Sequence, residues 1–183
     1  MLVSALVPVL ASFACVPQQP AAAVPPAAPA AAPALIRAAV ITGENNHDWP
    51  WTSREIASAL RETGRFEVLV VDQPAAWLAD APARLQRGEL HVLVLDYNGK
   101  RWGDAAERGF VDAVAAGCGV SVLHAANNAF PGWADYERMV GLLWRDGTGH
   151  GSFHPFDVVV VDPHHPITRG MADLRLHPDE LYH

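Results

Sequence analysis

A chain of 183 residues has room for one domain with a sizeable buried core, but not for two independent ones. Hydrophobic residues make up 50% of the sequence and charged residues 18%, a composition that excludes wholesale disorder. With 13 Lys and Arg against 20 Asp and Glu, the net charge of −7 has the wrong sign for binding a phosphate backbone, so nucleic acid is not an expected partner.

Residues 1–36 are rich in alanine and proline and carry no charged side chain. Residues 2–14 are apolar over the length of a signal-peptide hydrophobic region and are too short to span a bilayer, so no stable membrane span is expected. The sequence therefore predicts a signal peptide over residues 1–16 and export to the periplasm or the extracellular space.

Two alternatives to simple export stay open. No Lys or Arg precedes the apolar region, which is atypical of signal peptides and leaves a cytoplasmic location open. Cys15 offers a site for a lipid anchor. Residues 17–34 predict a disordered Pro/Ala-rich linker of extended geometry.

A folded domain is predicted over residues 35–183. Four short apolar runs have the length and the branched composition of buried strands, at 35–41, 66–71, 90–95 and 119–123. Helical patterns lie between or after them. The first helix is predicted from an N-cap at Ser53 to Arg61, and a short or broken helix at 74–88. Two more helices are predicted at 104–116 and at 133–144. A late strand is predicted at 156–161. Because uninterrupted apolar strands alternate with helices, we expect a doubly wound α/β fold, a parallel sheet with helices on both faces.

Ligands of such a sheet bind outside the carboxyl ends of the strands. His47 and Asp48 follow the first predicted strand, and His124 and Asn127 follow the fourth. His124 occupies the turn from strand to helix, with small residues beside it, which is where α/β enzymes expose a nucleophile on a tight elbow.

Several motifs resemble one known family. The segments are GENNHDW (43–49), YNGKRW (97–102), VLHAANNAFPGWADYERMVG (122–141), HGSFHPFDVVV (150–160), DPHHPITRG (162–170) and DELYH (179–183). From about Ile36 to the last residue, the chain is similar to the ThuA-like (trehalose utilisation) proteins.

The resemblance implies a flavodoxin-like fold of the class I glutamine amidotransferase type and a role in bacterial carbohydrate breakdown, on trehalose or keto-glycosides. Amidotransferases carry a cysteine at the elbow that His124 occupies here, and Cys118 lies on the wrong side of the strand, so glutamine hydrolysis is not expected. Relatives continue past the DELY motif, so we expect the domain to be truncated at its C-terminus.

Candidate roles follow from side-chain chemistry. An imidazole at residue 124 can act as a general acid or base, ligate a metal or serve only in structure. Substrate contacts are expected from His47, Asp48 and His150, with N-capping of a helix as the competing role of Asp48. Indoles stack on sugar rings, so Trp49 and Trp133 are candidates for a carbohydrate pocket, with plain packing as the alternative.

The DELY motif adds candidates at the end of the chain. Asp179 and Glu180 are expected to supply catalytic carboxylates, and Tyr182 a substrate contact. With His124 as acid or base, proton abstraction beside a keto group is the first reaction to test, and a divalent metal ion held by His47, His124 and His150 would assist it. The rival hypotheses are a carbohydrate-binding module without catalysis and an inactive truncated remnant.

Overall fold

A computed structural model describes residues 34–183 of the chain. The predicted signal peptide, the anchor at Cys15 and all but the last residue of the predicted linker lie outside the described residues. Among residues 34–183, no helix is both long and apolar enough to cross a membrane.

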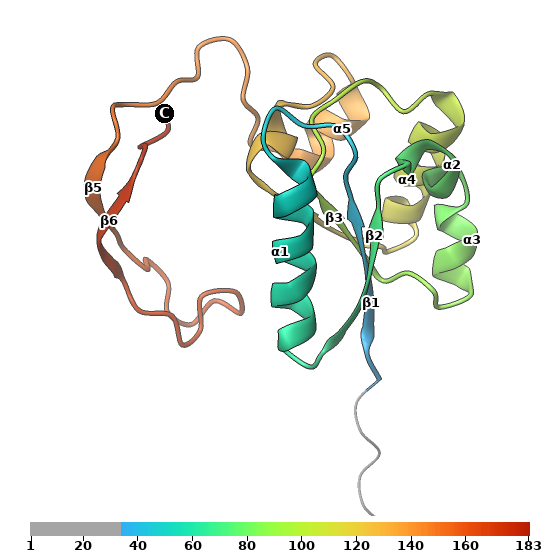
Figure 1. Ribbon diagram of the computed structural model, residues 1–183, viewed down its shortest axis with the longest axis horizontal. Helices are drawn as coiled ribbons and strands as arrows, with labels where there is room; N and C mark the ends of the chain where they lie inside the picture. The colour runs from blue at the N-terminus through green and yellow to red at the C-terminus, as the bar shows by residue number, and fades with distance from the viewer. Residues whose placement is uncertain (1–33) are drawn as a thin grey trace, which may run out of the picture. The chain divides into compact units, whose positions relative to one another are not determined.

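Four parallel strands form the central sheet (Figure 1). They are β1 (Ile36–Ile41), β2 (Phe66–Val71), β3 (Val92–Leu95) and β4 (Gly119–Val122), and they lie side by side in the order β2-β1-β3-β4. In the register of the sheet, Ala38 of β1 lies opposite Val68 of β2 and Val92 of β3. This order, with the first strand inside the sheet, confirms the flavodoxin-like α/β fold.

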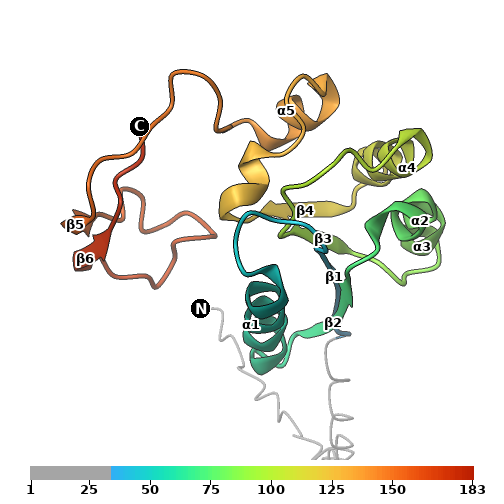
Figure 2. The same ribbon diagram turned by 45° about the horizontal axis from the view of Figure 1, so that its top comes forward.

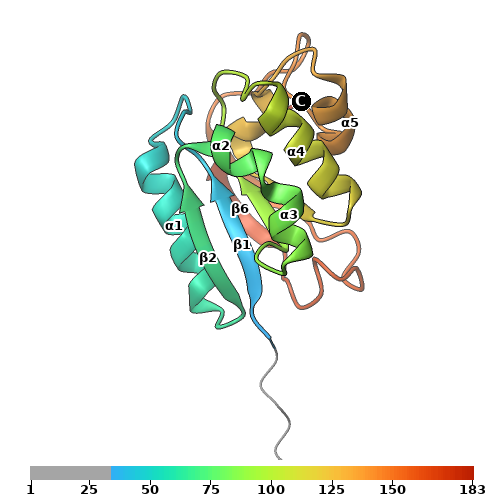
Figure 3. The same ribbon diagram turned by 90° about the vertical axis from the view of Figure 1, so that its right-hand side faces the viewer.

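Helices cover both faces of this sheet (Figures 2 and 3). On one face lies α1 (Trp49–Glu62), and on the other lie α2 (Pro74–Ala79), α3 (Ala81–Gln86) and α4 (Asp104–Ala115). Alternate residues of β1 point to the two sides: Val40 packs in a cluster with Ala57 of α1, whereas Ile41 belongs to the larger core that includes Phe110 of α4. A strand buried on both faces has to be apolar throughout, which is the pattern that predicted it.

Two helix boundaries differ from those predicted. The first helix begins at Trp49 rather than after Ser53, because the Asp48 carboxylate caps it by accepting the Trp51 backbone N–H at 3.2 Å. Ser53 lies buried within that helix. The segment predicted at 133–144 contains a shorter helix, α5 (Ala134–Val140), which Gly141 ends with a φ of 77°.

The late strand does not join the parallel sheet. It forms β5 (His154–Val158), which pairs antiparallel with β6 (Leu174–Asp179) in a separate two-stranded sheet (Figure 1). Most of this hairpin is exposed. The valine-rich run at 156–161 indicated a strand, but a local pattern does not reveal its partner.

An aromatic cluster fills the core beneath α4 and α5. Phe130 packs against Trp102, Trp133 and Tyr136, with ring centroids 4.7–5.4 Å apart. Trp133 is only 7% exposed and belongs to the hydrophobic core, which is the plain packing that we kept as the alternative to a place in a sugar pocket. The Arg101 guanidinium lies over the Trp133 ring, 4.6 Å from its centroid, and closes this part of the core.

Arg101 also makes the ion pair that generates our first prediction. Its Nε donates to Glu107 Oε1 at 2.6 Å, and this hydrogen bond is the main cause that lowers the pKa of Glu107 below its ordinary value of 4.5. A carboxyl whose pKa is lower in the folded state stabilises the protein above its ordinary pKa and loses that contribution as the pH falls through its folded pKa.

We therefore predict that Glu107→Gln lowers the free energy of unfolding by about 1 kcal/mol at neutral pH, because the charge-assisted bond is lost. The difference in the free energy of unfolding between the variant and the wild type should become smaller as the pH falls below 4.5. Urea denaturation at neutral and acidic pH measures it, and a gap that stays constant with pH would contradict the role of the ion pair.

Candidate functional site

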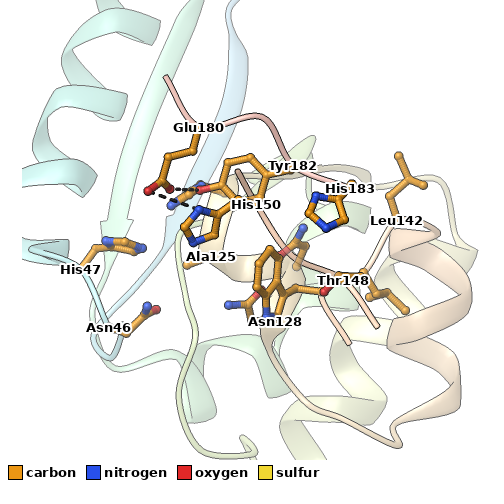
Figure 4. A pocket seen from close by; sticks show the side chains of 14 residues that line it. Asn46, His47, Ala125, Asn128, Leu142, Thr148, His150, Glu180, Tyr182 and His183 are labelled. Atoms are coloured by element: carbon orange, nitrogen blue, oxygen red, sulfur yellow. Dashed lines mark hydrogen bonds and ion pairs between the residues drawn. The ribbon is translucent and has the colours of Figure 1, made fainter. Parts of the chain in front are cut away.

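A cavity of about 590 Å³ lies where the loops after the parallel strands meet the C-terminal segment (Figure 4). Four parts of the chain form it: the loop between β1 and α1, the turn after β4, and the two segments 142–150 and 180–183. Its size is that of pockets that hold small molecules.

The loop after β1 contributes Asn46 and His47 to the lining. The His47 backbone N–H donates to Asn45 Oδ1 at 3.2 Å, and Asn45 Nδ2 donates in turn to Asp96 Oδ1 at 3.2 Å. Thr52 Oγ1 donates to the other Asp96 oxygen at 2.7 Å. The buried Asp96 carboxylate at the end of β3 therefore ties the His47 loop to the first turns of α1.

Burial raises the pKa of the Asp96 carboxyl. The hydrogen bond from Thr52, the charge of His47 and the hydrogen bond from Asn45 act in the opposite direction and favour the carboxylate.

The turn after β4 presents His124. A short 3-10 helix, η1 (His124–Asn128), follows the strand directly, and His124 adopts a φ of 41°, which is rare for a residue with a side chain. The buried Ala125 and Ala126 leave room for this tight turn. The predicted elbow is therefore present, and it brings the His124 ring to 4.7 Å from the His47 ring, measured between centroids.

The third wall comes from two segments that pair through their backbones. Gly149 and His183 exchange two backbone hydrogen bonds of 2.8 and 2.9 Å, and an isolated bridge joins His150 to Tyr182. On the cavity side, Tyr182 donates its hydroxyl to Glu180 Oε2 at 3.2 Å, and His150 Nδ1 lies 3.4 Å from Glu180 Oε1. Figure 4 shows these three side chains as one cluster.

The Tyr182 ring links this cluster to the elbow. Its centroid lies 5.5 Å from that of His150 and 6.2 Å from that of His124. Partial burial, together with the hydrogen bond to Glu180, raises the pKa of the phenol, which therefore keeps its proton. Residues His47, His124 and His150, which lie far apart in the sequence, thus line one cavity together with Glu180, Tyr182 and Asn127.

Four predicted site residues do not line this cavity. Asp48 caps α1, Trp49 begins that helix, and Trp133 lies in the core. Asp179 is exposed on the hairpin, and its carboxylate lies 3.6 Å from His177 Nε2.

The sequence did not single out several lining residues. They are Asn46, Leu142, Leu143, Trp144, Thr148 and His183. Apart from Asn46 and His183, they lie in or beside a loop whose composition gave no signal of a site. Within residues 34–183, no three His, Cys, Asp or Glu side chains are grouped so that they could hold a metal ion. The divalent ion stays a prediction.

Comparisons with known proteins agree on one family. The profile of the ThuA family, described as trehalose utilisation, matches residues 37–183. The solved structure of a ThuA-like protein from Parabacteroides merdae is 30% identical, with a TM-score of 0.68, and the match covers 81% of this chain and 63% of that one. A second ThuA-like structure, from Bacteroides uniformis, is 19% identical with a TM-score of 0.56 and coverages of 86% and 64%, and shows the shared fold.

The chain thus spans less than two thirds of the length of either solved relative. No protein with a curated description matches it.

The network around Asp96 gives a prediction about the site. Asp96→Ala should lower the free energy of unfolding by about 1–3 kcal/mol, because it leaves Thr52 and Asn45 without their buried acceptor. Asp96→Asn should lower the free energy of unfolding by less than about 1 kcal/mol, since an amide accepts from Asn45 and can donate to Thr52 Oγ1. Urea denaturation measures both variants, and equal losses would contradict an organising role of this side chain.

Proposed function

The chain belongs to the ThuA family, and on that premise we propose that its cavity binds a small saccharide on which His124 acts as acid and base. One observation carries this proposal: four imidazoles, a carboxylate and a phenol from widely separated parts of the sequence line one cavity. Groups of this kind accept and donate protons near neutral pH or bind sugar hydroxyls.

The reaction that suits these groups is proton abstraction from a carbon next to a keto group. In that step His124 takes the proton, and the electron pair of the broken C–H bond moves to the carbonyl oxygen and gives an enediolate. The His47 ring, whose centroid lies 4.7 Å from that of His124, would donate to that oxygen as its charge develops. His150, with Glu180 and Tyr182, forms the opposite side, where the sugar hydroxyls would bind.

Covalent catalysis by cysteine has little support in this site. The free cysteine of the described residues, Cys118, is buried just before β4, and burial raises the pKa of its thiol to about 11. A thiol with that pKa is protonated at neutral pH and is not a nucleophile. This supports a chemistry different from glutamine hydrolysis.

Turnover of 3-keto-glucosides tests the proposal. We expect His124→Gln to lower kcat by about 100-fold or more while the sugar still binds, because proton transfer is lost and the cavity is kept. His177→Gln, on the exposed hairpin outside the cavity, is the matched control and should have wild-type activity.

Two results would contradict catalysis by His124. Equal turnover by the wild type and His124→Gln would remove its role as acid and base. Sugar binding without turnover by either protein would instead favour a carbohydrate-binding module.

A further inference from the structure

The two ends of the cavity differ in chemistry. Figure 4 shows Asn46, His47 and Glu180 on one side and Leu142, beside Thr148 and His183, on the other. Leu142 is followed by Leu143 and Trp144 in the lining, and we call these three residues the apolar wall. The Leu142 side chain is 86% exposed although it borders the cavity. A ligand that covers such a leucine removes apolar surface from water, and this burial favours binding.

The apolar wall is held in place from behind. Arg145, the next residue, donates to the Trp144 carbonyl at 2.8 Å and to the carbonyls of Asn127 and Ala129, at 3.2 and 3.1 Å, around the end of η1. Its Nε donates to Glu137 Oε1 of α5 at 2.9 Å. The guanidinium therefore fixes the Trp144 end of the apolar wall against the segment that carries His124.

The same bonds limit the charge of the ligand. Arg145 directs its donors to these carbonyls and to Glu137, and none of the lining residues within 34–183 is a lysine or an arginine. Phosphates and carboxylates are bound in proteins by such cations. The lining does contain the carboxylate side chain of Glu180, which disfavours an anion further.

We propose that the apolar wall is the subsite for the aglycone, the non-sugar part of a glycoside. The preferred ligand is then an uncharged glycoside with an apolar or aromatic aglycone, whose sugar lies among His47, His124 and His150. Trp144 supports this placement because its ring lies 5.7 Å from Tyr182 and 6.1 Å from His150, so that one ligand can touch the wall and the polar side chains together. The inference rests on the proposed saccharide site and adds the class of its substrate.

Calorimetry with two ligands that differ only in the aglycone tests the inference. Phenyl and methyl 3-keto-glucosides, in both anomeric forms, are titrated into the full chain. We expect the wild type to bind the preferred phenyl glycoside about tenfold more tightly than its methyl counterpart, because the ring buries apolar area on the wall. Leu142→Asn should remove most of this preference for the phenyl glycoside.

Leu176→Asn is the matched control. Leu176 is a second exposed leucine, 72% exposed on β6 outside the cavity, and its φ of 49° is one that asparagine tolerates. This variant should keep the tenfold preference of the wild type. Because both leucines are exposed, neither substitution removes a core contact.

The outcomes separate the inference from the function on which it rests. If the wild type binds phenyl and methyl glycosides equally, or if Leu142→Asn keeps the full preference, the aglycone subsite is wrong and the saccharide site stands. If the wild type binds neither glycoside, the proposed function itself is overturned.

Discussion

The site depends on one constraint, the parallel direction of the central strands. Because β1, β3 and β4 are neighbours that run the same way, the loops that follow them meet at one edge of the sheet. His47 and His124 lie 77 positions apart in the sequence, yet their rings come within 4.7 Å across the end of β3. Asp96 follows that middle strand and holds the His47 loop through Asn45, so the carboxylate that organises the edge also fixes one of its two imidazoles.

The rest of the site comes from outside the sheet. The residues around Gly149 pair with the last residues of the chain through backbone hydrogen bonds, and this pairing presents His150, Glu180 and Tyr182 to the elbow. The cavity therefore has a wall set by the sheet and a wall set by a short antiparallel ladder, and Arg145 joins them through the carbonyls of η1 and Trp144. The sheet wall supplies the proposed proton transfer, and the second wall supplies the side chains that would select the sugar and its aglycone.

The sequence predicted the parts of this arrangement that depend on local physics. Continuous apolar runs indicated the parallel strands, and a histidine with small neighbours at the end of β4 indicated the elbow. The sequence did not show that Glu180 lines the cavity and Asp179 does not. Neighbouring residues of an extended chain face opposite ways, and only the partner strand decides which of them faces inward. The sequence left the role of Trp133 open, since an indole beside a loop looks the same in sequence whether it stacks on a sugar or fills a core. Trp144 was missed because its place depends on the long-range contacts of Arg145.

The histidines themselves provide the most direct test of the shared cavity. Four of the nine in the chain line it: His47, His124, His150 and His183. In a titration with a 3-keto-glucoside followed by NMR of the assigned imidazole signals, these four should shift, while those of His91, His154, His164, His165 and His177 should stay in place. Shifts confined to that second group, or signals of residues 47, 124 and 150 that do not respond together, would contradict a single site.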